Sequence, residues 1–364
     1  MHVILLCALL LQVPEHKVDT AVEKGSGYLR KAFSDRNRVA NHPLSGKFDM
    51  DELVLYTLLH AGVDPKDGTV AALVGRLTSR DIERTYNAAL CAMALEAYDS
   101  KSYQWRIAQC AQHLVDNQAA NGQWSYGMKI KLPSNVPTGP PSGGSTPGST
   151  KSLPSIKIRK GEAKGPATGD NSNSQYAALG LRAAAKAGIT VPADVIALAA
   201  KWWEEGQRGD GSWGYNDEGM TGDAGYGAMT AGGAASLIIL KDLEKKDGSK
   251  GNAPVKKALD WMGANLDYTR NPSYHNAWMW QFYWIYAVER AADLAGVDKV
   301  GSHAWYPEGA QYLIDNQKAD GSWNGLSSDG KESVGGVIAD TCFAILFLRR
   351  ATKAKPRVAT GTGK

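Results

Sequence analysis

The pattern Gln-x-x-x-Gly-x-Trp occurs three times in this chain and marks it as a repeat protein. The copies share one internal spacing: Gln118/Gly122/Trp124, Gln207/Gly211/Trp213 and Gln317/Gly321/Trp323. Each follows a stretch with helical periodicity and precedes an apolar, Ala-rich stretch. Gly tolerates the positive φ that a helix exit needs, Gln can pair backbone groups left open at helix ends, and Trp covers both with an apolar face. The repeating unit is therefore predicted to be a helical hairpin.

Helical stretches that lack the motif complete the repeat. Six stretches, several of them amphipathic, are expected to form outer helices: Val18 to Phe33, Thr69 to Leu77, Tyr103 to Asn117, Ala193 to Gly206, Ala253 to Leu266 and Pro307 to Asn316. Six more continuously apolar stretches, as in helices buried on most faces, follow them as inner helices: Asp51 to Ala61, Ile82 to Ala97, Asn173 to Ala187, Ala224 to Lys241, His275 to Ala295 and Gly336 to Thr352. This count predicts an all-α fold, a single (α/α)6 toroid of six helical hairpins.

A ring of twelve helices accounts for nearly all of the 364 residues, so we predict one domain over residues 18–352 and a flexible tail over residues 353–364. Residues 128–169 form an insertion in the third hairpin that is rich in Pro, Gly, Ser and basic side chains. The simplest interpretation is a mobile loop whose deletion changes the melting temperature little. A lid over the mouth of the ring is the functional alternative.

The N-terminal segment carries an apolar run from Val3 to Val13, long enough for the core of a signal peptide and too short to span a bilayer. Residues 1–17 are a candidate signal peptide, so we expect export to the periplasm or the exterior, with a cytoplasmic location as the alternative. No basic stripe with interleaved aromatic residues marks the predicted helices, which argues against nucleic-acid binding. Cys91, Cys110 and Cys342 fall inside predicted helices without CxxC spacing and are expected to be buried thiols.

The repeated motif resembles the QW motif of the squalene-cyclase and prenyltransferase repeat superfamily. The resemblance implies a barrel of stacked helical hairpins, like those of terpenoid cyclases. It concerns the fold and leaves the chemistry open.

Candidate functional residues gather where the inner helices begin, because helix dipoles and unpaired amides would converge there on a central cavity. The acids at these positions are Asp49, Asp51, Asp223 and Asp340. The candidate cavity-lining residues are Tyr86, Asn173, Tyr176, Tyr226, His275, Trp278 and Trp280. Asp and Asn before a helix are also ordinary N-caps, so each has a purely structural alternative.

Family chemistry can be compared residue by residue. The segment Asp49-Met50-Asp51-Glu52 partly matches the Asp-x-Asp-Asp motif of triterpene cyclases, which implies Asp51 as proton donor. The zinc site of prenyltransferases implies a pair such as Asp340 and Cys342 with a further ligand from His275. Carbohydrate-active toroids share the same plan, and Asp223 with Asp340, or His275 with Tyr226, are candidate acid and base pairs.

No complete catalytic set from these families is present. The sequence therefore favours an exported ligand-binding or scaffold toroid whose aromatic-lined cavity takes an apolar, isoprenoid-like molecule, or which binds a protein partner. An isoprenoid-acting enzyme is the alternative, and a carbohydrate-active enzyme comes third. No metal, cofactor or transmembrane span is expected.

Overall fold

The computed structural model describes residues 13–34, 50–140, 154–161, 165–216, 224–245, 248, 252–275, 279–325 and 336–352. Twelve helices and two short strands lie in these ranges. The outer helices are α2 (Glu15–Ser34), α5 (Gly68–Ser79), α7 (Gln104–Asp116), α9 (Ala193–Glu205), α11 (Ala253–Asn265) and α13 (Trp305–Asp315). The inner helices are α4 (Asp51–Ala61), α6 (Thr85–Asp99), α8 (Asn171–Lys186), α10 (Gly227–Leu243), α12 (Gln281–Ala295) and α14 (Gly336–Leu348).

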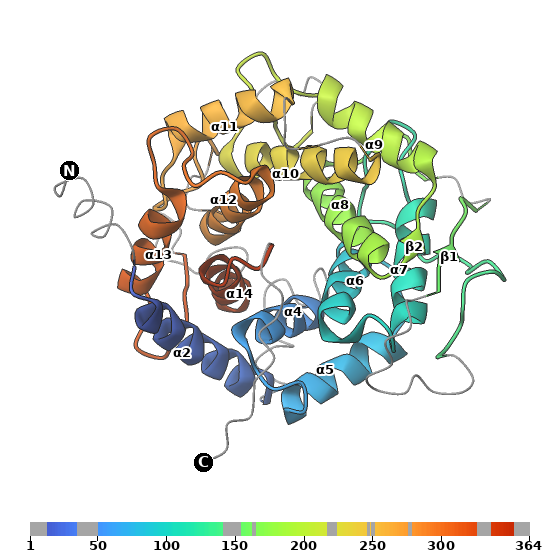
Figure 1. Cartoon of the computed structure of the whole chain (residues 1–364), viewed down its shortest axis with the longest axis horizontal. Helices are drawn as coiled ribbons and strands as arrows, with labels where there is room; N and C mark the ends of the chain where they lie inside the picture. Colours follow the sequence, from blue (N-terminus) through green and yellow to red (C-terminus); the bar gives the residue numbers. More distant parts are fainter. Residues whose placement is uncertain are drawn as a thin grey trace.

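Figure 1 shows the outer helices as a ring around the inner helices, with outer and inner elements alternating along the chain. The predicted single (α/α)6 toroid is therefore confirmed. α14 packs against α4 and α2, which brings the last hairpin beside the first and closes the ring. The inner helices contribute most of the core because they are apolar on nearly all faces; in α14, for example, every residue except Val337 is buried. No helix among the described residues is long and apolar enough to cross a membrane.

The three Gln-x-x-x-Gly-x-Trp motifs join neighbouring outer helices. Each Gln donates from Nε2 to the carbonyl of its own motif Gly and to a carbonyl of the next outer helix. The partners in that helix are Val195 at 2.9 Å, Pro254 at 2.7 Å and Ala21 at 2.8 Å. The third motif reaches α2, so the same contact closes the ring.

The motif tryptophans are buried, as expected for large aromatic residues at the hairpin corners. Trp124, Trp213 and Trp323 lie inside the core, each 0% exposed. Their Nε1 atoms donate to the carbonyl ten residues earlier, in the preceding outer helix: Leu114 at 2.6 Å, Trp203 at 3.1 Å and Leu313 at 2.7 Å. Because an indole has one donor and a large apolar surface, this bond satisfies the donor and lets the rest of the ring pack between helices. The motif tryptophans are therefore core residues that tie each motif back to its own hairpin.

The motif glycines are required by both backbone conformation and space. Gly122, Gly211 and Gly321 have φ values of 97°, 92° and 90°. A Cβ at these positions would lie 2.5 to 2.6 Å from a carbonyl oxygen of the next outer helix. The left-handed conformation and the close backbone approach therefore both select Gly.

Loops also tie the inner helices together at their N-terminal ends. The amide of Thr85 donates to the carbonyl of Tyr126 at 2.9 Å, and the amide of Asn171 donates to the carbonyl of Tyr215 at 2.9 Å. Both carbonyls lie two residues after a motif Trp. The segment after each of the first two motifs is thereby held over the start of the preceding inner helix.

The insertion packs against α7 where the structure describes it. The side chains of Gln104, Gln109 and Gln112 donate to insertion carbonyls at 2.6 to 2.8 Å, and Asp116 accepts from Gly161 N at 2.6 Å. Strand β1 (Ile156–Lys157) pairs in parallel with β2 (Ile189–Thr190) and lies on the outer side of the ring (Figure 1). These packed residues differ from the expected mobile loop, because polar side chains of α7 bind their backbone.

The fifth inner helix is shorter than expected. The sequence favoured a start at His275, whereas α12 begins at Gln281. Trp280 adopts a left-handed conformation with φ 61°, which an α-helix cannot continue through. At the other end of the chain, α2 begins at Glu15, inside the candidate signal segment 1–17. Most of the apolar run that suggested export lies outside the described residues.

Candidate ligand-binding cavity

A cavity of about 270 Å³ lies where the inner helices begin. All six inner helices contribute, for example Leu53 of α4, Tyr176 of α8 and Phe343 of α14. Loops that precede the inner helices complete the wall with Tyr126, Tyr215, Tyr226, Asn271, Tyr274 and Trp280. The volume is near the lower end of the range for small-molecule pockets, about 300–1,000 Å³.

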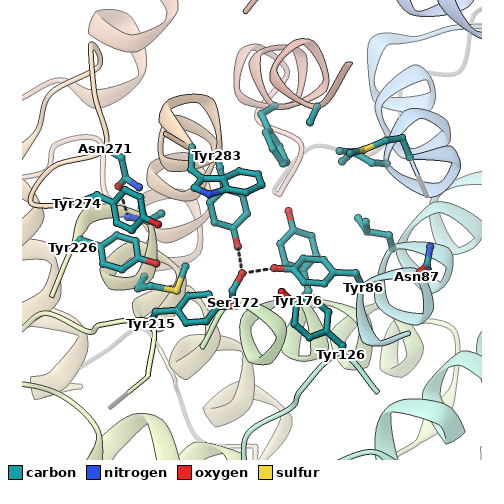
Figure 2. A pocket seen from close by; sticks show the side chains of 18 residues that line it. Tyr86, Asn87, Tyr126, Ser172, Tyr176, Tyr215, Tyr226, Asn271, Tyr274 and Tyr283 are labelled. Carbon is teal, nitrogen blue, oxygen red and sulfur yellow. Dashed lines mark hydrogen bonds between the residues drawn. The ribbon is translucent and has the colours of Figure 1, made fainter. Parts of the chain in front are cut away.

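The wall of the cavity is mainly aromatic. Nine of its residues carry aromatic rings: Tyr86, Tyr126, Tyr176, Tyr215, Tyr226, Tyr274, Trp280, Tyr283 and Phe343. No Asp, Glu, Lys, Arg or His belongs to the wall within the described ranges. Figure 2 shows tyrosines on several sides of the cavity, among them Tyr86, Tyr215, Tyr274 and Tyr283. Such a wall suits an apolar molecule that carries few polar groups.

Three hydroxyl groups meet in the cavity. The Ser172 Oγ atom is hydrogen-bonded to the Tyr86 hydroxyl and lies 3.4 Å from the Tyr283 hydroxyl, as Figure 2 shows. Burial raises the pKa of both tyrosines above the ordinary value for a phenol. Burial has the same effect on the pKa of Tyr176 and Tyr215. The tyrosines therefore stay neutral near pH 7 and offer hydroxyl groups without charge.

Buried residues close the cavity on the side away from its mouth. Arg290 is 1% exposed and donates from Nη2 to Gln175 Oε1 at 2.8 Å. Its guanidinium group lies 4.4 Å from the ring centroid of Tyr286 and 5.7 Å from that of Tyr176, distances typical of cation–π contacts. Arg290 and Gln175 thus fill the centre of the ring beyond Tyr176. The cavity lies only at the end of the ring where the inner helices begin.

Asp170 lies directly behind the tyrosine wall. It caps α8 by accepting from Asn173 N at 2.7 Å and from Asn173 Nδ2 at 2.8 Å, and it also accepts a hydrogen bond from the Tyr215 side chain. Burial outweighs these hydrogen bonds and raises the pKa of the Asp170 carboxyl group. Asp170 is therefore a buried acid that reaches the cavity through one cavity-lining hydroxyl.

Four of the expected cavity residues line the cavity: Tyr86, Tyr176, Tyr226 and Trp280. Asn173 is instead fully buried behind it, against Asp170. His275 is exposed, with its ring 4.3 Å from that of Tyr274. Asp49, Asp223 and Trp278 lie outside the described residues.

The repeated motifs themselves contribute no side chain to the described cavity wall. Trp124, Trp213 and Trp323 are fully buried and belong to the hydrophobic core, away from any surface that a ligand could reach. The motif Gln and Gly residues are likewise absent from that wall. The motif is therefore part of the scaffold that positions the site, and its tryptophans are not candidates for ligand contact.

The acid implied as proton donor faces away from the cavity. Asp51 accepts from Arg76 Nε at 2.7 Å and from Arg76 Nη2 at 3.0 Å, and Arg80 lies 3.5 Å away. Asp51 is absent from the described cavity wall. Arg76 binds both oxygens of the Asp51 carboxylate, so neither oxygen is directed at the cavity.

The candidate zinc ligands do not converge on one point. Asp340 accepts from Gly325 N at 2.9 Å, and Cys342 is a buried free thiol whose pKa burial raises to about 12. Two residues apart on a helix, these side chains point in different directions. Within the described ranges, no group of three His, Cys, Asp or Glu side chains could hold a metal ion.

Several cavity residues, among them Tyr126, Tyr215, Ser172, Tyr274 and Asn271, were not predicted from the sequence. Tyr126 and Tyr215 each follow a motif Trp by two residues, and both line the cavity. A longer motif, Gln-x-x-x-Gly-x-Trp-x-Tyr, would have found them in two of the three copies. Ser172, Tyr274 and Asn271 have no comparable signal.

Type II terpene cyclases are among the solved structures with the same fold. A variant of MstE from Scytonema in complex with the substrate geranylgeranyl dihydroxybenzoate is 11% identical, with a TM-score of 0.55 over 93% of this chain and 98% of that chain. A second variant, in complex with the product merosterolic acid A, is 11% identical, with a TM-score of 0.54 over the same shares. Apo MstE gives 11% identity and a TM-score of 0.53 over 92% of this chain and 99% of that chain.

No family profile and no curated protein sequence matches the chain. At this identity the likeness concerns the fold alone. The chain is a terpenoid-cyclase-like toroid.

Proposed function

We propose that this toroid binds an apolar, isoprenoid-like small molecule in the cavity at the N-terminal ends of its inner helices. The observation that carries the proposal is the wall of nine aromatic residues, which has no charged side chain among the described residues. Aromatic and aliphatic walls bind apolar chains by removing their surface from water. The three neutral hydroxyl groups around Ser172 can pair with a single polar group on such a ligand.

The similar structures support the same ligand class. The MstE complexes contain a geranylgeranyl-bearing substrate and a terpenoid product. This chain has the same fold, so its cavity lies in the same kind of helical ring and suits a related ligand. The share of each chain that is covered exceeds nine-tenths, so the whole ring is common to both.

The test is a calorimetric titration with farnesylacetone, a polyprenyl ketone. We expect saturable binding of one molecule per chain. Ala339 lines the cavity and is 2% exposed, so Ala339→Phe should fill part of the space and weaken binding on the order of tenfold or more. Ala319→Phe, at an exposed position, is the control and should bind normally. Equal affinities for both variants would place the ligand elsewhere and overturn the proposal.

Acid-catalysed cyclisation of the same ligand class is the second candidate, and Asp170 favours it. This buried acid, whose pKa is raised by burial, is hydrogen-bonded to the cavity-lining Tyr215. A proton could pass through the Tyr215 hydroxyl to an alkene in the cavity. Asp170→Asn preserves an N-cap of α8, because Asn caps as well as Asp.

The cyclase candidate predicts an isomeric, more cyclic product from a polyprenyl substrate, detected by gas chromatography with mass spectrometry. The Asp170→Asn variant should lose the product and retain binding, whereas Asp51→Asn should retain both. Binding without product in the unmodified protein would leave the ligand-binding function as the account of the cavity.

We also propose that the protein is exported, because residues Val3 to Val13 form an apolar run. Fractionation of cells that produce the full chain tests it. Recovery in the exported fraction with a shortened N-terminus agrees with the proposal, and full-length protein in the cytoplasm contradicts it.

A further inference from the structure

One end of the cavity holds a side chain whose hydrogen-bond donor has no partner. Asn271 is fully buried and lines the cavity beside Tyr226 and Tyr274, as Figure 2 shows. Its Nδ2 atom finds no hydrogen-bond partner among the described residues. A buried amide NH2 group without a partner is costly, because it has left water without replacing the hydrogen bonds that water provided.

The orientation of the Asn271 amide is fixed by the start of α10. Its Oδ1 atom accepts from Ala228 N at 2.9 Å, so the opposite assignment would set two donors against each other. Gly227 packs closely here, since a Cβ at Gly227 would lie 2.9 Å from Asn271 Oδ1 and 2.9 Å from Trp284. The side chain therefore cannot turn its oxygen to the cavity without losing the bond to α10.

We propose that Asn271 Nδ2 binds a hydrogen-bond-accepting oxygen on the ligand, so that the cavity selects an oxygenated isoprenoid-like molecule over a pure hydrocarbon. This inference rests on the proposed ligand-binding function. The wall around Asn271 supplies no positive side chain within the described ranges. The N-terminal end of α10 adds a partial positive charge at this position, which favours an electron-rich oxygen.

The test compares two ligands of matched size: farnesylacetone and the hydrocarbon in which a CH2 group replaces its carbonyl. Both are titrated into the full-length protein and into two variants. Asn271→Leu removes the donor and keeps the approximate size of the side chain. Asn271→Asp, measured at pH 8, keeps an acceptor for Ala228 N and removes the NH2 donor, so it guards against misfolding caused by loss of that contact.

The inference predicts that both variants bind the ketone on the order of tenfold more weakly than the unmodified protein, because a buried hydrogen bond is lost. Affinity for the hydrocarbon should change by less than about twofold for Asn271→Leu, since an apolar ligand makes no use of the donor. Melting curves confirm that each variant is folded.

Equal changes for the two ligands, or no change for either, would overturn the role of Asn271 and leave the proposed function standing. If the unmodified protein bound neither ligand, the proposed function would fail and this inference with it. The two failures are therefore distinguished by the unmodified protein alone.

Discussion

At the scale of single residues, a buried histidine makes the stability of the ring depend on pH. Neither ring nitrogen of His113 has a hydrogen-bond partner among the described residues. Burial lowers the pKa of His113 from 6.5 to about 4. Below about pH 6.5 His113 is protonated in the unfolded chain, whereas in the folded chain it stays neutral until the pH nears 4. The stability that depends on neutral His113 is therefore present above pH 6.5 and is lost as the pH falls towards 4.

The predicted loss from His113 between pH 6.5 and pH 4 is on the order of 3 kcal/mol. His113→Leu removes this term, so the free energy of unfolding of the variant should fall less between pH 7.5 and pH 5 than that of the unmodified protein. Urea denaturation at several pH values measures the difference. Parallel pH profiles for the two proteins would contradict the assignment.

The motif glycines provide a second prediction at this scale. Gly211→Ala forces a left-handed residue to carry a Cβ that would lie 2.6 Å from Lys257 O. We expect a loss of about 1–3 kcal/mol in the free energy of unfolding, or more if the backbone of α11 cannot move. Gly209 is two residues away, and a Cβ there would meet nothing within 4 Å.

Gly209→Ala is thus a matched control and should change the stability by no more than about 0.5 kcal/mol. Denaturant midpoints measure both variants. Similar small effects for the two substitutions would show that the motif Gly is not needed for contact between adjacent hairpins.

Among the elements, α7 differs from its sequence equivalent α13. The segments Gln112 to Gln118 and Gln311 to Gln317 share Gln, Leu, Asp, Asn and Gln at the same positions. Gln112 is fully buried and donates to Arg159 O at 2.6 Å, because the insertion covers α7. Gln311 is exposed, and among the described residues its amide donates to Asp315 of its own helix, at 2.8 Å.

This difference yields a prediction about the insertion. Gln112→Ala should cost about 1–3 kcal/mol, since it removes a fully buried side chain together with its hydrogen bond to Arg159 O. Gln311→Ala should cost no more than about 0.5 kcal/mol, as expected for an exposed site. Chemical denaturation of both variants provides the comparison. A neutral Gln112→Ala would show that the insertion does not stabilise α7, in line with the mobile loop that composition suggested.

The same pair of helices shows what sequence could and could not predict. The motif indicated where hairpins turn, because its Gln, Gly and Trp act locally and through a contact that repeats around the ring. It did not indicate that the described parts of the insertion would cover one outer helix, because this depends on polar contacts between segments far apart in sequence. Identical residues in α7 and α13 consequently have different burial.

For the molecule as a whole, the ring was predictable and the contents of its centre were only partly so. Periodicity and repeated motifs placed six inner helices, and hence aromatic residues such as Tyr86 and Tyr176, around one cavity. Side-chain direction decided the rest: Asp51 lies near the start of an inner helix but points to Arg76. Asn271 lies in a loop without a repeat equivalent, so only the folded ring brings its amide to the cavity wall.

The central claim is that this cavity is a binding site, and methionine methyl groups provide the most direct test. Met50 and Met229 line the cavity, whereas Met262 is buried in α11 and Met128 is exposed. Methyl resonances of [¹³C-methyl]Met-labelled protein can be followed while farnesylacetone is added. The account predicts that the Met50 and Met229 signals shift with one common saturating affinity while those of Met262 and Met128 stay in place. Saturation without any shift at Met50 and Met229, or shifts confined to Met128, would contradict it.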